Sequence, residues 1–372
     1  MNEYQDKKNK LIELRNRIIR MPDNIEKNRL LYGYYGLLCY LKDINVIKKY
    51  QLSEYAIDDE YTKKYDKVIY QRTVKGIDEL ASTSPLLITG FQKLIKEYKN
   101  HKFSEFDDGC LTDVDSNKMY GYLFEFFKEM GVKELYDKMA LNGNITINQQ
   151  LDCATSSVNA ISVDNPCIVM TNPESHMIFY INLAHEMGHS YERLLRKRKN
   201  HFETFNMFTE TTATFFERYF CEFLKTKNID PAILSSIDTR NHIYNLNNFS
   251  AGKVLCRLLK NDVIYNIDPI SLNFESYYTL EKIQEMIEKE CGYFALDLDD
   301  LGLCVIFYSI GDVIANNLIN KMKKDPVNAW KEYKEFIRTY DSHPLKESLD
   351  AYFDVDLMKE NIKTFMKSYQ SR

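Results

Sequence analysis

The chain has 372 residues and 44% hydrophobic residues, which is enough to bury a large core in one to three domains. Its formal net charge of -5 disfavours nucleic acid or an anionic membrane surface as the main partner. Glycine (13) and proline (8) are scarce, which favours long helices, whereas 27 tyrosines and 21 phenylalanines indicate a thick core or an apolar groove.

The start of the chain, Met1 to Lys8, contains no apolar run and is not expected to be a secretory signal. No stretch approaches the roughly 20 apolar residues that a membrane-spanning helix needs. The eight cysteines are scattered and form no Cys-x-x-Cys pair, which is typical of reduced, buried thiols. These features predict a cytoplasmic protein that uses no membrane; they leave its oligomeric state open.

Apolar residues at three- and four-residue spacing, such as Leu11, Leu14 and Ile18, predict helices from Lys10 to about Lys99. The segment from Asp107 to Lys118 is polar and rich in turn-forming residues, so we expect a surface loop there. Residues 1–140 are therefore expected to form an N-terminal helical lobe.

The hydrophobic period changes between Asn144 and Thr171. Ile145 to Ile147 alternates, and the runs Val158–Val163 and Cys167–Met170 are short and apolar, with a turn at Asp164 to Pro166 between them. This is the only part of the chain for which we predict a small sheet.

The helical pattern returns from Ser175 to about Lys199, continues from about Phe205 to Lys225, and dominates from Leu280 to the C-terminus. No flexible linker or repeat interrupts residues 141–372, so we expect one compact region there. The predicted fold class is mainly α, with a small β-sheet beside a central helix and two lobes around a cleft.

The helix expected over residues 175–199 contains His185-Glu186-Met187-Gly188-His189. Two histidines four residues apart project from one helix face, so both imidazoles can reach a single ion. Glu186 leans toward the same ion, and as a general base it can hydrogen-bond a water on the metal. The alternative is a pair of surface histidines on an ordinary helix. Against it, Gly188 destabilises a helix interior by about 1 kcal/mol, which predicts that another element packs very close there.

A catalytic zinc site needs a third protein ligand. Glu192 lies on the same helix, about 10 Å from His185 along the axis, which is too far for both to bind one ion. A carboxylate on the next helix fits better, and we select Glu210 because its neighbours are largely uncharged. The other downstream candidates are His201, Glu203 and Glu217.

Glu217 lies seven residues after Glu210 and therefore shares its helix face. From there it could hydrogen-bond one of the two histidines. A salt bridge at a helix surface is the alternative interpretation.

The His185–His189 motif followed by Glu210–Glu217 resembles the thimet oligopeptidase and oligoendopeptidase F family of zinc metallopeptidases, which are gluzincins. That family has His-Glu-x-Gly-His, a glutamate ligand on the next helix and a second glutamate seven residues later. Residues 307–311 and 325–345 are also similar to its C-terminal helices. The resemblance covers residues 145 to 370 and identifies the chain as a short member.

The resemblance implies two further roles. The strand formed by Cys167, Ile168, Val169 and Met170 would be the edge strand to which an extended peptide substrate adds through backbone hydrogen bonds. Tyr308 would stabilise the oxyanion, although a tyrosine with apolar helix neighbours is also compatible with a core position.

The chain departs from the family pattern at two places. The family usually has a third histidine seven residues after the first, where this chain has Glu192. It also has a histidine and several tyrosines before its Tyr-x-x-Gly element, whereas residues 296–307 contain neither. Side chains that could replace them are His242, Tyr244, Tyr293, Tyr340 and His343.

The main hypothesis is a zinc-dependent endopeptidase or oligopeptidase of short peptides. It would use one zinc ion held by His185, His189 and Glu210, with Glu186 as the general base. The missing histidine and tyrosines suggest an alternative, a zinc-bound peptide-binding protein with little turnover. A second alternative is a metal-dependent hydrolase of a non-peptide amide.

Overall fold

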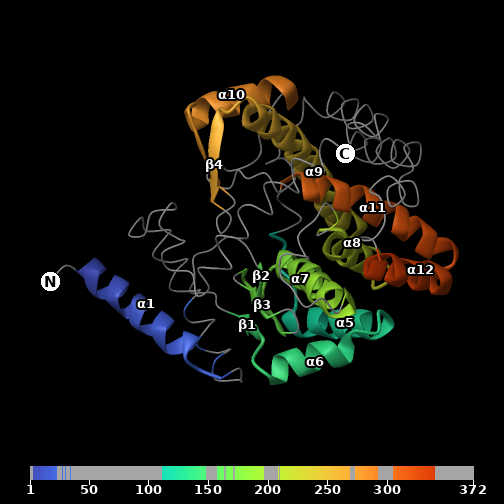
Figure 1. Cartoon of the computed structure of the whole chain (residues 1–372). Coiled ribbons are helices and arrows are strands. Elements are labelled where there is room, and N and C mark those ends of the chain that lie inside the picture. The colour runs from blue at the N-terminus through green and yellow to red at the C-terminus, as the bar shows by residue number, and fades with distance from the viewer. Residues whose placement is uncertain are drawn as a thin grey trace.

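The computed structural model describes residues 3–22, 27, 30, 34, 111–147, 157–162, 165–170, 172–196, 208, 210–268, 273–291 and 305–339. Most of these residues are helical, as predicted (Figure 1). The helices are α1 (Glu3–Ile19), α5 (Ser116–Glu129), α6 (Lys133–Leu141), α7 (Met177–Arg196), α8 (Thr211–Lys225), α9 (Pro231–Lys260), α10 (Leu280–Cys291), α11 (Val305–Lys324) and α12 (Pro326–Thr339).

The small sheet lies where the change of period predicts it, beside α7 (Figure 1). It consists of β1 (Ile145–Ile147), β2 (Ser157–Ser162) and β3 (Asn165–Met170) in the order β1-β3-β2. β3 pairs in parallel with β1 and antiparallel with β2. Because β3 lies between β1 and β2, it is not an edge strand of this sheet.

A second sheet was not expected from the sequence. β4 (Ile264–Asp268) and β5 (Asn273–Ser276) form an antiparallel hairpin that follows the end of α9. The prediction of a single sheet is therefore wrong. The hairpin strands are short and mix polar with apolar residues, so their alternation gives only a weak signal.

The core is rich in aromatic side chains, as the composition suggested. Phe126 of α5 packs against Phe216 and Phe220 of α8, with ring centroids 6.0 and 5.2 Å apart. On the other side of α8, Trp330 of α12 stacks on Phe215 and also on Tyr191 of α7. One continuous core thus joins α5, α7, α8 and α12.

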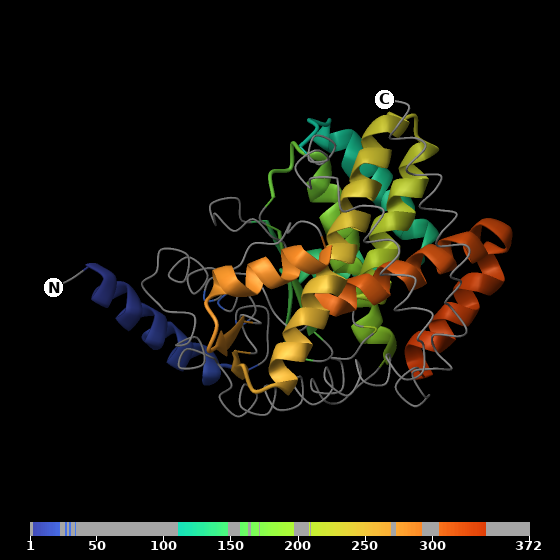
Figure 2. The same ribbon diagram turned by 90° about the horizontal axis from the view of Figure 1, so that it is seen from above.

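The helices around α7 are grouped, whereas α1 lies apart on one side (Figures 1 and 2). Figure 2 shows α8 and α9 side by side, and both also contact α11. The division at residue 140 into two lobes stays a prediction, because residues 35–110 lie outside the described residues.

The segment before α7 is held by α5 and by the residues that precede α5. Backbone N–H groups of Val114 and Met177 donate to Ser175 and Thr112, and the Tyr120 hydroxyl donates to Glu174 at 2.5 Å. The predicted loop is present over residues 111–115, but residues 116–118 belong to α5, whose first turn is capped by the Asp115 side chain. These contacts fix the position at which α7 begins.

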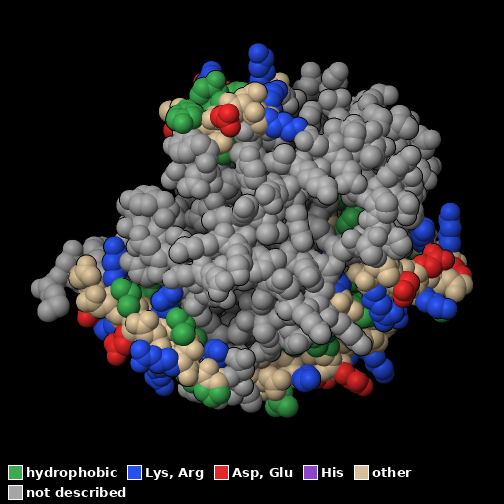
Figure 3. Space-filling view, in the orientation of Figure 1, with side chains coloured by type: hydrophobic (Ala, Val, Ile, Leu, Met, Phe, Trp, Pro, Cys, Tyr) green, Lys and Arg blue, Asp and Glu red, His purple; other side chains and the backbone are tan. Residues whose placement is uncertain are grey.

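The surface of the described residues carries mixed charge. In Figure 3, basic and acidic side chains intermingle over α1 and over α11 and α12. Among the helices that the structure describes, none is long and apolar enough to cross a membrane. Cys221 is a buried free thiol, as predicted for the cysteines.

Candidate metal centre

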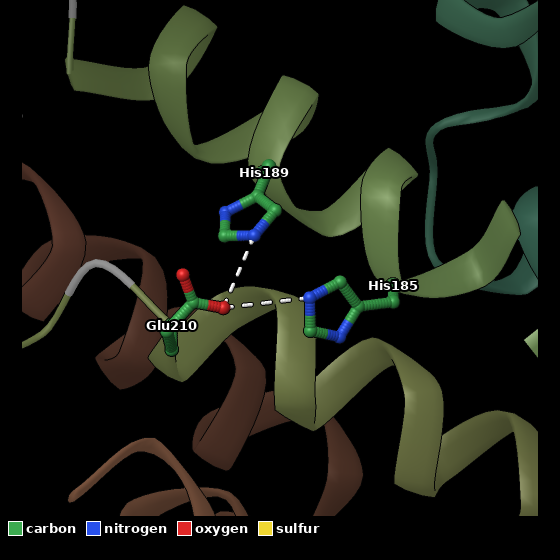
Figure 4. Close-up of side chains that lie close together, drawn as sticks. All are labelled: His185, His189 and Glu210. Atoms are coloured by element: carbon green, nitrogen blue, oxygen red, sulfur yellow. Dashed lines mark ion pairs between the residues drawn. The ribbon is translucent and has the colours of Figure 1, made fainter. Parts of the chain in front are cut away.

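The side chains of His185, His189 and Glu210 meet between α7 and α8 (Figure 4). Glu210 Oε2 lies 3.4 Å from His185 Nε2 and 3.2 Å from His189 Nε2. One donor atom of each side chain lies within 4.8 Å of the others, so the three could hold one metal ion. Two imidazoles and a carboxylate are also a donor set that zinc takes in hydrolases, with a further position left for water.

The three side chains are mostly buried. Their exposed fractions are 15% for His185, 16% for His189 and 11% for Glu210. The interpretation as two histidines on an ordinary solvated helix is therefore disfavoured, because such side chains would be far more exposed and would not converge on a carboxylate.

Gly188 brings α7 and α8 into backbone contact, as its place in the helix predicted. A Cβ atom at Gly188 would lie 2.7 Å from Ala213 Cα and 2.7 Å from the Thr212 carbonyl oxygen. Real side chains do not approach backbone atoms so closely. Only glycine therefore lets the two helices come near enough for Glu210 to reach both histidines.

Gly311 of α11 makes a similar contact with the ligand residue itself. A Cβ atom at Gly311 would lie 2.9 Å from the Glu210 carbonyl oxygen and 3.2 Å from its Cβ. Tyr308 lies one turn before Gly311, on the same face of α11, and is half-buried. Its predicted role in stabilising the oxyanion stays a prediction.

Glu210 occupies the position immediately before the first residue of α8. Its backbone is already helical (φ -88°, ψ -3°), and its carbonyl accepts from the Thr214 N–H at 2.9 Å. Its side chain makes no capping hydrogen bond, so the carboxylate is directed to the histidines. The predicted helix from residue 205 is shorter at its start, because α8 begins at Thr211.

The cluster shifts the pKa values of its members in opposite directions in the metal-free protein. Burial by itself would lower the pKa of His185, but hydrogen bonds to Glu210 and Glu217 outweigh it and raise that pKa well above its ordinary value. Burial would raise the pKa of Glu210, but the two histidines outweigh it and lower that pKa below the usual range.

Glu186 lies on α7 beside this cluster and is 6% exposed. Its Oε2 is buried and has no hydrogen-bond partner among the described residues. Burial raises the pKa of Glu186, although the two histidines oppose the shift. An unsatisfied buried carboxylate oxygen is costly, and a water molecule at the metal position would satisfy it.

Glu217 contacts His185 from the side opposite Glu210. Its Oε2 lies 2.9 Å from His185 Nδ1, and its Oε1 accepts from the Asn241 amide of α9. The interpretation as a helix-surface salt bridge is therefore wrong, because the carboxylate is 13% exposed and faces His185 of the cluster. No sequence pattern singled out Asn241.

The predicted role of the strand Cys167, Ile168, Val169 and Met170 is contradicted. β3 is the middle strand of its sheet, so backbone groups on both sides are already paired and a peptide cannot be added. The side chains of Ile168 and Met170 are fully buried in the core. An apolar run of this length is typical of a central strand, whereas the edge position was implied by the family resemblance alone.

Of the remaining candidates, the described one does not join the cluster. Glu192 lies beyond His189 on α7 and pairs with Arg196 at 3.0 Å. Five candidates lie outside the described residues: His201, Glu203, Tyr293, Tyr340 and His343. His242 and Tyr244 lie in α9, but their side chains are outside the described part of the structure.

The pKa of His185 predicts how metal affinity depends on pH. Because the pKa of His185 is raised by folding, protonation of this ring stabilises the metal-free protein. The stabilisation is complete below the ordinary histidine pKa of about 6.5 and is lost as pH rises through the higher pKa of the folded protein. A metal ion needs the neutral ring, so it competes with this proton. Zinc affinity should therefore rise by up to about tenfold per pH unit at all pH values below the raised pKa, a range that includes the ordinary value of about 6.5 and extends above it.

This dependence is measured by titrating metal-free protein with zinc against a chromophoric chelator at several pH values. The melting temperature gives a second readout, since the increase caused by zinc should grow with pH. An affinity that stays constant over this range would contradict the assignment of His185 as a ligand.

Comparisons with known proteins support the fold. No family model matches the sequence, and no curated protein matches it either. Three solved structures are similar to the chain. PZ peptidase A with an inhibitor has 11% identity, covers 97% of this chain and 71% of its own, and has a TM-score of 0.52.

The other two structures carry the name oligoendopeptidase F. The one from Bacillus anthracis strain Ames has 13% identity, covers all of this chain and 75% of its own, and has a TM-score of 0.50. The other has 12% identity, covers 97% of this chain and 70% of its own, and also has a TM-score of 0.50. At these identities the likeness is one of fold, and it includes the part of the chain before residue 145.

Proposed function

We propose that this protein is a zinc-dependent peptidase that hydrolyses short peptides. The observation that carries the proposal is the convergence of His185 and His189 with Glu210, while Glu186 lies on the same helix as the histidines. The likeness in fold to three structures named as peptidases supports the same activity.

The proposed ligands are His185, His189 and Glu210, which would hold one zinc ion. When bound, zinc would act as a Lewis acid that polarises a carbonyl group and makes water a nucleophile at neutral pH. A peptide carbonyl and a water molecule would complete the coordination of the ion, and they would approach it from the side on which the three side chains are 11–16% exposed.

Glu186 would accept the proton of the attacking water and pass it to the leaving nitrogen. Its burial suits this role, because a carboxylate with a raised pKa holds and releases a proton more readily near neutral pH. Tyr308, one turn from the glycine that contacts Glu210, is the proposed donor to the oxyanion.

The substrate would bind as an extended strand at an outer edge of the small sheet. Among the described strands, β2 is an outer strand that also contacts α7. Backbone hydrogen bonds to β2 would give affinity without strict side-chain selectivity. This replaces β3 as the substrate strand.

The test is incubation with a defined peptide library, with and without a chelator, and analysis of the products by mass spectrometry. We expect cleavage at internal bonds that is lost with chelator and restored by zinc. Cleavage that survives complete metal removal would refute a metallopeptidase. Metal binding without cleavage of any peptide would instead favour a zinc-bound peptide-binding protein. Cleavage restricted to small amides would favour a metal-dependent hydrolase of a non-peptide amide.

A further inference from the structure

The carboxylate of Glu217 joins three helices behind the metal centre. Its Oε2 faces Nδ1 of His185 on α7 at 2.9 Å, and its Oε1 accepts a hydrogen bond from the side-chain amide of Asn241 on α9. Each oxygen therefore has a different partner. A chain of contacts runs from α9 through α8 to the ring of His185.

This chain of contacts determines which nitrogen of His185 is available. A carboxylate at Nδ1 favours a proton on that nitrogen, which leaves the lone pair on Nε2. Nε2 is the nitrogen that lies 3.4 Å from Glu210, at the proposed metal position. The orientation of the Glu217 carboxylate thus controls both the tautomer and the tilt of the ring.

α9 is held on either side of Asn241. One turn earlier, Asp238 accepts a hydrogen bond from Arg218 of α8 at 2.8 Å. One turn later, the carbonyl of Asn245 accepts from the Ser309 hydroxyl of α11. Anchored at both ends of this stretch, Asn241 can hold the carboxylate of Glu217 in a fixed orientation.

We infer that Asn241 is a positioning residue that acts through Glu217 to hold His185 ready for the metal ion. The inference rests on the proposed function, since it assigns a role toward the same metal. The competing explanation is that Asn241 only contributes to the packing of α8 on α9. In that case each variant should lose zinc affinity only to the extent that it loses folding stability.

The test measures zinc affinity of the full-length, metal-free protein by competition with a chromophoric chelator. We expect Asn241→Ala to weaken zinc binding by up to about tenfold, because the direct partners of ligand histidines contribute about 10- to 100-fold and Asn241 acts through such a partner. In a Glu217→Ala background the same change should alter affinity less than twofold, because the residue that transmits the effect is gone. Ile237→Val, a buried change one turn away on α9, is the packing control and should leave affinity unchanged.

Asn241→Asp separates positioning from packing. It keeps the size of the side chain but places a second carboxylate against Glu217, which repels it. Positioning predicts weaker zinc binding in Asn241→Asp than in Asn241→Ala, whereas packing predicts the reverse order. Three results would each overturn the inference. The zinc affinity of Asn241→Ala could lie within twofold of the wild-type value, its effect could be additive with that of Glu217→Ala, or Asn241→Asp could bind zinc more tightly than Asn241→Ala. Failure of the wild-type protein to bind zinc would overturn the proposed function as well.

Discussion

Glu186→Gln is expected to reduce peptide hydrolysis by about 10²- to 10⁴-fold, the usual contribution of a general base, while zinc still binds. The amide has nearly the same shape as the carboxylate but cannot accept the proton of the attacking water. His185, His189 and Glu210 keep their positions, so affinity for the metal should change little. The reduction should appear in kcat more than in KM, because the lost interaction belongs to the transition state.

The measurement compares kcat and KM for a cleaved peptide, with the zinc content determined on the same samples. Glu332→Gln is the matched control, since that side chain lies on α12 with 64% of its surface exposed. We expect the control to retain wild-type activity. Full activity of a zinc-loaded Glu186→Gln protein would show that another group takes the proton.

Gly188→Ala is expected to impair both the fold and the metal site. The added Cβ atom would lie 2.7 Å from Ala213 Cα, so α7 and α8 must move apart. Such overpacking destabilises a protein by about 1–3 kcal/mol. Since His185 and His189 are on one helix and Glu210 precedes the other, the same movement separates the ligands. A displacement of about 1 Å can reduce activity by about 100-fold.

Gly121→Ala provides the control for glycine replacement in a helix. Gly121 lies inside α5, is exposed, and has no atom within 4 Å of an added Cβ. Alanine should therefore stabilise the protein by up to about 1 kcal/mol through helix propensity, without changing activity. The midpoint of thermal unfolding and the zinc affinity are measured for both variants. If the Gly188→Ala protein binds zinc as tightly as the wild type, the two helices can move apart without loss of zinc affinity, which would contradict this prediction.

The sequence identifies much of the candidate centre because its signals are local. The two histidines and Glu186 lie within one helical turn or so, and a fixed helix geometry converts their spacing into a common face. Gly188 adds a packing signal, and the uncharged neighbours of Glu210 mark a carboxylate that is not simply solvated. The structure brings these residues together as the spacing predicts.

The features that the sequence does not reveal depend on contacts between distant segments. Asn241 lies 24 residues from Glu217, and nothing in its neighbourhood in the sequence marks it as the partner of that carboxylate. Helix α9 itself was not predicted, because it contacts α8, α10, α11 and β4 and its apolar residues form no single stripe. The order of the strands cannot be read from alternation either, so the sequence does not show that β3 lies between β1 and β2.

The place of Glu210 at the start of α8 has a consequence for the electronic character of the centre. The first peptide N–H groups of a helix carry a partial positive charge, and its field acts on the carboxylate of the residue that precedes them even without a hydrogen bond. A carboxylate in this position is a weaker electron donor to a cation than one in mid-helix. The ion held here would keep more of its own positive charge, and so remain a stronger electrophile toward the oxygen of a bound carbonyl group.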